Sequence, residues 1–320
     1  MGIQGISTTD FKFPGQTGLY HGKVRDVYDI GDEKIVMIVT DRISAFDVVL
    51  PRAIPYKGQV LNQLAAHFLD KTSDIVPNWL QAVPDPSASV GQKADPVKIE
   101  MVIRGYLVGH AWREYKAGKR ELCGQPMPDG MAENDAFPKP LITPTSKADT
   151  GHDEDMTEAE ILEQGLATPE EWKQLCDYSQ KLFARGQEMA RTQGLVLVDT
   201  KYEFGRLDGK IILIDEVHTP DSSRYFYADG YDKYAAGDKS EPPKQLSKEF
   251  VREWLMDNGF KGDKGQAVPE LTDEFVTSVS DRYIELYEKM SGQKFQKVKA
   301  DDLLKRIETN VTNYLTKADA

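Results

Sequence analysis

The sequence predicts an α+β protein built from two lobes. Residues 18–40 and 195–214 each have the pattern of an antiparallel β-hairpin, in which apolar or alternating segments flank a turn. Helical patterns finish the chain at 247–258, 272–291 and 300–315. We therefore expect a mainly antiparallel, β-rich lobe over residues 1–98, and an α+β lobe over 99–320 that ends in a helical cover from about residue 245.

The hairpin at 195–214 has an unusual charge pattern. Its arms are apolar and β-branched, and Asp208-Gly209 between them is typical of a two-residue type I′ turn. Charged side chains lie in or beside these arms, namely Asp199, Lys201, Glu203, Asp215 and Glu216. Because unpaired charge in an apolar strand is costly, this set of carboxylates and a lysine indicates a metal and phosphate site.

A strict two-residue turn also fixes which residues pair. Glu203 then lies opposite Ile214, and Lys201 lies opposite Glu216. Asp215 would point to the other face of the sheet. Either a bulge or a strong twist returns Asp215 to the face of Glu203, or Glu216 is the closer carboxylate.

The hairpin at 18–40 carries cations. Its sequence alternates, turns at Gly31-Asp32 and becomes continuously apolar. Strict alternation places Lys23 and Arg25 on one face, behind Gly22, which allows close backbone approach. Such a strand could cover nucleotide phosphates, although an exposed polar strand face has the same pattern.

Between the hairpins, 97–104 has the pattern of a strand and 124–155 is a proline-rich loop that ends near Lys147 and Asp153. Long loops inside compact domains are often functional, although a solvated acidic loop fits this stretch as well. Capping boxes then predict two helices, which begin at Thr157 and Thr168.

Composition bounds the class of protein. The 320 residues are 40% hydrophobic and 29% charged, as in an ordinary globular protein. A net charge of −12 disfavours nucleic acid and anionic membranes as partners, whereas local clusters of Lys and Arg suit small phosphorylated metabolites. Cys123 and Cys176 lack metal or redox spacing, and the sequence shows neither a secretion signal nor a membrane span. We expect a cytoplasmic protein.

Common catalytic strings are absent from the sequence: G-x-G-x-x-G, Walker A, G-x-S-x-G and H-E-x-x-H. A cationic hairpin in one lobe and a carboxylate-bearing hairpin in the other instead favour a kinase-like nucleotide cleft between the lobes. A phosphotransferase acting on a hydroxyl group would need H-R-D-like and D-F-G segments, which the chain lacks. A non-catalytic nucleotide-binding scaffold would not require the carboxylates and the lysine.

Four strings in order carry a resemblance to a known family. They are Gly22-Lys-Val-Arg-Asp-Val-Tyr28, Asp41-Arg-Ile-Ser-Ala-Phe-Asp47, Val198-Asp-Thr-Lys-Tyr-Glu-Phe-Gly205 and Asp215-Glu-Val-His-Thr-Pro-Asp-Ser-Ser-Arg224. Together they resemble the SAICAR synthetase family of purine biosynthesis. The resemblance extends from about Gly18 to the final helices, and D-x-K-x-E-F-G is specific on its own.

The resemblance implies an ATP-dependent ligase. Such an enzyme joins the carboxylate of 5-amino-1-(5-phosphoribosyl)imidazole-4-carboxylate to the amine of L-aspartate, and it releases SAICAR, ADP and phosphate. It also implies Mg²⁺ and an acyl phosphate, because a carboxylate is a poor electrophile. Residues 1–98 would be the ATP-binding lobe, and 99–320 the substrate- and metal-binding lobe.

The resemblance also implies a role for individual residues. ATP would be bound by Gly22, Lys23, Arg25, Glu203 and Asp215, and the last two would also hold Mg²⁺. The catalytic residues would be Lys201, Lys147 and Asp153. The other substrates would be bound by Ser44, Arg104, His110, Asp221, Ser223 and Arg224.

Two positions depart from the family pattern. Lys98 stands where a proline is usual, and His110 follows Gly109 where a serine is usual. His110 either replaces the serine as a donor to the substrate phosphate or packs beside Trp112.

Overall fold

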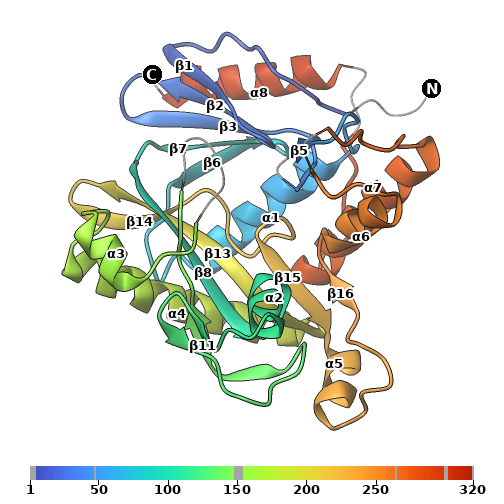
Figure 1. The fold of residues 1–320 in the computed structure, drawn as a ribbon. Coiled ribbons are helices and arrows are strands. Elements are labelled where there is room, and N and C mark those ends of the chain that lie inside the picture. The colour runs from blue at the N-terminus through green and yellow to red at the C-terminus, as the bar shows by residue number, and fades with distance from the viewer. Residues whose placement is uncertain (1–4, 47, 148–153, 264, 299–301, 319–320) are drawn as a thin grey trace. The chain divides into compact units, whose positions relative to one another are not determined.

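The computed structural model describes residues 5–46, 48–147, 154–263, 265–298 and 302–318 (Figure 1). The chain forms two compact units, and each is described by itself. Unit 1 comprises Met1–His67, Trp79–Lys93 and Ser247–Ala320; unit 2 comprises Phe68–Asn78 and Ala94–Leu246. The C-terminal helices therefore group with the first hairpin, which differs from the lobes predicted at 1–98 and 99–320.

Unit 1 is built on a five-stranded antiparallel sheet in the order β1-β2-β3-β7-β6. The strands are β1 (Gln16–His21), β2 (Arg25–Ile30), β3 (Lys34–Val39), β6 (Leu80–Asp85) and β7 (Ala88–Gln92). A separate pair is formed by β4 (Ser44–Ala45) and β5 (Val48–Val49). The predicted hairpin with its turn after Ile30 is confirmed as β2 and β3.

The predicted placement of Lys23 on that strand is wrong. A further hairpin pairs β1 with β2, and Lys23 lies in the connecting loop at 22–24. Strand β2 begins only at Arg25, which is half-buried, whereas Asp26 and Tyr28 are buried. Gly22 explains the early break, because its N–H donates to the carbonyl of Arg25 in a tight reversal.

Four helices belong wholly or partly to unit 1. They are α1 (Lys57–Lys71), α6 (Glu249–Asp257), α7 (Asp273–Ser291) and α8 (Leu303–Ala318). The last three confirm the predicted helical patterns. In Figure 1, α8 runs alongside the strands of the sheet, and Ile307, Val311 and Leu315 enter the core that contains Tyr28 and Val36. This apolar face explains why the C-terminal segment packs with the first hairpin.

Unit 2 is built on a seven-stranded antiparallel sheet in the order β11-β8-β13-β15-β16, in which β12 pairs with β8 and β14 pairs with β13. The strands are β8 (Asp95–Tyr106), β11 (Ala136–Ile142), β12 (Thr145–Ser146), β13 (Leu195–Leu207), β14 (Lys210–Ile214), β15 (Ser223–Tyr227) and β16 (Gln245–Leu246). A small separate pair is formed by β9 (Glu121–Leu122) and β10 (Gln125–Pro126). The predicted proline-rich loop therefore contains strands that pair with β8.

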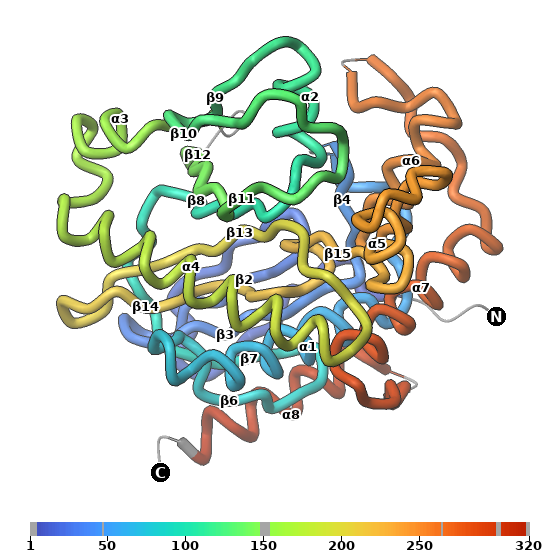
Figure 2. The backbone as a smooth tube through the Cα atoms, turned by 90° about the horizontal axis from the view of Figure 1, so that it is seen from below, coloured from blue at the N-terminus to red at the C-terminus, as the bar shows by residue number. Residues whose placement is uncertain are grey.

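The helices of unit 2 are α2 (Gly109–Lys116), α3 (Glu158–Glu163), α4 (Pro169–Thr192) and α5 (Ala228–Ala235). Both predicted capping boxes are present, with Thr157 before α3 and Thr168 before α4. Figure 2 shows α4 running along the sheet beside β13. Its Phe183 lies against Gly105 of β8 and its Tyr178 stacks on Phe204 of β13, so α4 covers one face of the sheet.

The predicted turn of the second hairpin is confirmed. Asp208 and Gly209 have φ of 50° and 72°, which is the left-handed pair that a type I′ turn requires. The register places Glu203 opposite Ile214, as predicted. Within the described residues, no helix combines the length and apolar character needed to cross a membrane.

Asp41 joins the N-terminal segment to the start of α1. Its Oδ2 accepts from the N–H of Ile6 at 2.7 Å, and its Oδ1 accepts from the N–H of Gly58 at 2.8 Å. Burial raises the pKa of Asp41 to about 6, against the opposing effect of these hydrogen bonds.

The raised pKa predicts a specific pH dependence of stability. A carboxyl group whose pKa is higher in the folded state favours folding at low pH, and this contribution is lost as the pH rises through the folded pKa. Between about pH 4 and pH 7, wild type should therefore lose roughly 2 kcal/mol of unfolding free energy relative to Asp41→Asn. Urea unfolding across this range measures the difference, and a difference independent of pH would contradict the assignment.

Candidate active site

Two neighbouring strands of unit 2 place charged side chains in adjacent rows. In the antiparallel register of β8 and β13, Arg104 lies opposite Asp199 and Glu100 lies opposite Glu203. Lys201 lies between the two carboxylates of its strand. Because directly paired residues point to the same side, both rows share the face opposite α4.

The first part of the site is a cluster of lysines and carboxylates. The Nζ of Lys201 lies 2.6 Å from Oε1 of Glu100 and 3.1 Å from Oε1 of Glu203. The Nζ of Lys147 donates to the other oxygen of Glu203. Glu203 is only 6% exposed, so a buried carboxylate is shared by two ammonium groups.

These contacts decide the charge of each group. Burial alone would raise the pKa of Glu203, but Lys201 and Lys147 outweigh it and hold that pKa below its ordinary value. For both lysines, burial acts to lower the pKa, and the neighbouring carboxylates, led by Glu203, raise it instead. The lysines are therefore charged at neutral pH and suit the stabilisation of anions better than nucleophilic attack.

Asp215 and Glu216, although adjacent in sequence, have different surroundings in the structure. Asp215 has φ of 60°, so strand β14 ends before it and strict alternation stops. Besides burial and Glu203, Asp215 is a further cause of the pKa shifts of Lys147 and Lys201, which places its charge near theirs. Glu216 is buried and accepts a hydrogen bond from Thr219.

The predicted pairing of Lys201 with Glu216 is wrong. The N–H of Lys201 donates to the carbonyl of Ser222, and its partner across β8 is Val102. The left-handed residue at the end of β14 prevents the hairpin from extending that far. The choice between Asp215 and Glu216 as the carboxylate beside Glu203 stays a prediction.

The second part of the site contains two arginines. Asp199 is paired with Arg104 on one side and with Arg224 on the other. Arg104 Nη1 lies 3.4 Å from Oδ2 of Asp199, and Arg224 Nε lies 3.7 Å from Oδ1. Burial lowers the pKa of Arg104, and the charge of Arg224 lowers it further. Two guanidinium groups around one carboxylate leave an excess of positive charge, which suits an anion such as phosphate.

The start of α2 lies against this arginine pair. Gly109 has φ of 56°, and a Cβ added there would overlap the guanidinium of Arg224. The following residue, His110, has its Nε2 2.7 Å from Oδ2 of Asp155. Trp112 stacks on Tyr115. The structure therefore gives His110 a carboxylate partner that neither sequence-based interpretation included.

The remaining predicted residues divide between the units. Ser223 is buried with its hydroxyl 2.8 Å from that of Thr200, and Asp221 lies in the turn before β15. In unit 1, Gly22 and Lys23 lie in the loop between β1 and β2, Arg25 begins β2, and Ser44 begins β4. Asp153 lies outside the described residues.

Sequence reasoning missed Glu100, Thr143 and Asp155, which contact Lys201, Arg104 and His110, respectively. A signal was present for Glu100, because it shares the alternating face of a predicted strand with Arg104. Its significance depends on the pairing of β8 with β13, which no local pattern specifies.

Comparison with known proteins decides the family. The family model described as SAICAR synthetase matches residues 18–269. The chain belongs to the SAICAR synthetase family. A phosphoribosylaminoimidazole-succinocarboxamide synthase of Bacteroides thetaiotaomicron is 60% identical over 98% of this chain and 100% of its own length. The enzyme of the same name from Cytophaga hutchinsonii is 59% identical, with 98% of this chain and 100% of its own covered.

Solved structures agree with this assignment. A SAICAR synthase from Saccharomyces cerevisiae, complexed with SAICAR, has a TM-score of 0.76 and 30% identity, covering 91% of this chain and 100% of its own. A SAICAR synthetase solved in complex with ADP shares the fold, with a TM-score of 0.66 and 23% identity over 88% of this chain and 100% of its own. The predicted α+β fold of the SAICAR synthetase family and the predicted class, a ligase of purine biosynthesis, are confirmed.

The lysine and carboxylate cluster predicts a stability effect. Glu203→Gln leaves two ammonium groups beside a neutral amide, and the loss of charge-assisted hydrogen bonds should cost about 2 kcal/mol or more. Urea unfolding at neutral pH measures the loss. Glu163→Gln, at an exposed position of α3, is the matched control and should have little effect. Equal stability of both variants would contradict the described network.

Proposed function

We propose that this chain joins the phosphoribosyl imidazole carboxylate to L-aspartate at the expense of ATP, releasing SAICAR, ADP and phosphate. The observation that carries this proposal is the name shared by relatives that are about 60% identical over their full length. The yeast structure with 30% identity is itself a complex with SAICAR, which supports the same substrate class.

The geometry of unit 2 supports this reaction. Asp199 and Glu203 are four residues apart on β13, which corresponds to about 13 Å along a strand. The arginine pair lies at one end of this interval and the lysine and carboxylate cluster at the other. A substrate with a phosphate at one end and a carboxylate at the other could therefore contact both ends of one sheet face.

The charge state of the lysines fits acyl activation. A carboxylate oxygen of the substrate would attack the γ-phosphorus of ATP, and the bond to ADP would break. The amine of aspartate would then attack the acyl carbon, with loss of phosphate and a proton. Lys201 and Lys147 would stabilise the negative charge that accumulates in both steps, because they remain protonated beside Glu203.

Mg²⁺ is part of the proposal. Within the described residues, no group of three or more potential protein ligands is suited to a metal ion. Mg²⁺ commonly binds through one or two carboxylates and substrate phosphates, so Glu203 and Asp215 fit as a partial donor set. When bound, the ion would neutralise phosphate charge. The electrostatic link of Asp215 to both lysines supports its place beside Glu203.

The family resemblance also supports roles for residues that bind ATP and the other substrates. Gly22, Lys23 and Arg25 of unit 1 would bind ATP phosphates. Arg104, His110, Ser223 and Arg224 would bind the ribose phosphate, and Ser44 and Asp221 would complete the contacts to substrates. Asp153 would act with Lys147 and Lys201 in catalysis. The net charge of −12 is consistent with small-molecule partners rather than nucleic acid. A cytoplasmic location suits these metabolites.

The activity can be tested directly. Purified protein incubated with ATP, Mg²⁺, the imidazole carboxylate and aspartate should release ADP only when aspartate is present. Release without aspartate would indicate another acceptor, and no release would leave only nucleotide binding. Transfer of labelled oxygen from the substrate carboxylate into phosphate is the expected sign of the acyl phosphate.

Gly109 provides a test of the arginine pair. Gly109→Ala should displace Arg224 and raise the KM for the phosphoribosyl substrate about tenfold, while the KM for ATP stays near wild type. Gly165→Ala is the matched control, because Gly165 also has a left-handed φ, of 67°, but open space around its Cβ position. Steady-state kinetics with each substrate varied separately provides the measurement, and parallel effects of the two variants would refute the steric argument.

A further inference from the structure

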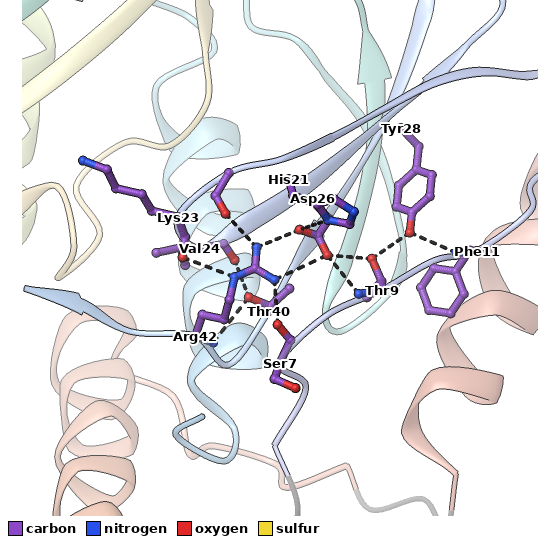
Figure 3. Close-up of polar contacts among 11 residues, drawn as sticks. Ser7, Thr9, Phe11, His21, Lys23, Val24, Asp26, Tyr28, Thr40 and Arg42 are labelled. Carbon is purple, nitrogen blue, oxygen red and sulfur yellow. Dashed lines mark hydrogen bonds and ion pairs between the residues drawn. The ribbon is translucent and has the colours of Figure 1, made fainter. Parts of the chain in front are cut away.

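Arg42 of unit 1 is the centre of a polar network around the loop at 22–24 (Figure 3). Its Nη2 donates to the carbonyl of Gly22 at 2.9 Å and to Oδ1 of Asp26 at 2.7 Å. Its Nη1 donates to the carbonyl of Ser7 at 2.9 Å and lies 3.4 Å from Oδ2 of Asp26. Its Nε lies 3.3 Å from the carbonyl of Lys23. The five contacts match the five N–H groups of a guanidinium.

The carbonyl of Val24, the last residue of the loop, is bound by Thr40, which lies two residues before Arg42. Val24 accepts from the N–H of Thr40 at 3.0 Å and from its hydroxyl at 2.6 Å. The carbonyls of Gly22, Lys23 and Val24 are thus bound by Thr40 and Arg42, two residues apart in sequence. In a trans peptide the N–H points away from the carbonyl, so the loop N–H groups turn away from Arg42. Figure 3 shows the Lys23 side chain extending away from it as well.

Asp26 fixes the orientation of the guanidinium. Its side chain is fully buried, and besides Arg42 it accepts hydrogen bonds from the N–H and hydroxyl of Thr9 at 3.1 and 2.7 Å. His21 Nδ1 lies 3.0 Å from the same carboxylate. Arg42 is 12% exposed, so its planar group is held between a buried carboxylate and the backbone of the loop.

We propose that Arg42 is a positioning residue for nucleotide binding, because it holds the 22–24 backbone in the conformation that presents the side chain of Lys23 and the N–H groups of Lys23 and Val24 to phosphate. This inference rests on the proposed function, in which Gly22, Lys23 and Arg25 bind ATP phosphates. The role requires arginine, because lysine has the same charge but only three donors and no planar fork. A loop ordered before binding avoids the entropy loss of ordering it with the ligand.

The test separates geometry from charge and from general stability. Arg42→Lys keeps the charge and should weaken ADP binding, measured by titration calorimetry with Mg²⁺, about tenfold or more. The KM for ATP should rise in parallel, while the KM for the imidazole substrate stays within about twofold of wild type. Trypsin should also cleave faster after Lys23 in this variant, because the loop backbone is released.

Thr9→Val is the matched control. This change removes one hydrogen bond to the same buried carboxylate and one to the hydroxyl of Tyr28, and Thr9 contacts no residue of the loop in the described network. It should lower stability and leave ADP affinity and cleavage after Lys23 unchanged. Thr40→Val removes the hydroxyl bond to Val24 and the acceptor of the Arg42 backbone N–H, while the Arg42 side chain stays in place. It should weaken ADP binding about threefold, and it is the substitute variant if Arg42→Lys does not fold.

The outcomes distinguish two failures. If the wild-type chain does not bind ADP, the proposed function fails and the inference fails with it. If wild type binds ADP and the folded Arg42→Lys variant binds it equally well, Arg42 has only a structural role and the inference is overturned. Equal weakening by Thr9→Val would overturn it too, because loss of stability alone would then explain the effect.

Discussion

The antiparallel register between β8 and β13 is the constraint on which the candidate site of unit 2 depends. It brings Arg104 to Asp199 and Glu100 to Glu203, across residues that are distant in sequence. A shift by one residue would turn each of these side chains toward α4 and the apolar core. The same register buries Tyr202 and Phe204 in that core. Apolar packing on one face of the sheet therefore determines which charged side chains lie together on the other face.

Charge balance then determines what each end of the face can bind. The carboxylates of Glu203 and Glu100 lie opposite each other and would repel. Lys201 contacts both of them and Lys147 contacts Glu203, so the two ammonium groups offset this repulsion. At the other end, Asp199 is flanked by two arginines, and a positive charge remains. A buried pair of this kind contributes little net stability by itself. Folding alone therefore gives little reason for these charges, which agrees with the proposed role of the two arginines in binding phosphate.

Local patterns predicted a substantial part of this structure. The Asp208-Gly209 turn, the pairing of Glu203 with Ile214 and both capping boxes depend on residues near in sequence, and all are present. The partner strand of β13 and the grouping of the C-terminal helices depend on contacts between distant segments, so periodicity alone could not give them. Asp215 was predicted only in part. Simple alternation continues the second arm of the hairpin through Asp215, whereas the strand ends before this residue and its backbone is left-handed.

The two units order their polar side chains in different ways. In unit 2 the sheet itself spaces the side chains, because cross-strand neighbours are fixed by backbone pairing. In unit 1 the chain leaves the sheet at 22–24, and the carbonyls of Gly22 and Lys23 are held by the side chain of Arg42. A buried carboxylate, Asp26, orients a guanidinium, and the guanidinium holds the backbone. Arginine serves in both units because its planar fork converts one fixed side chain into several directed donors.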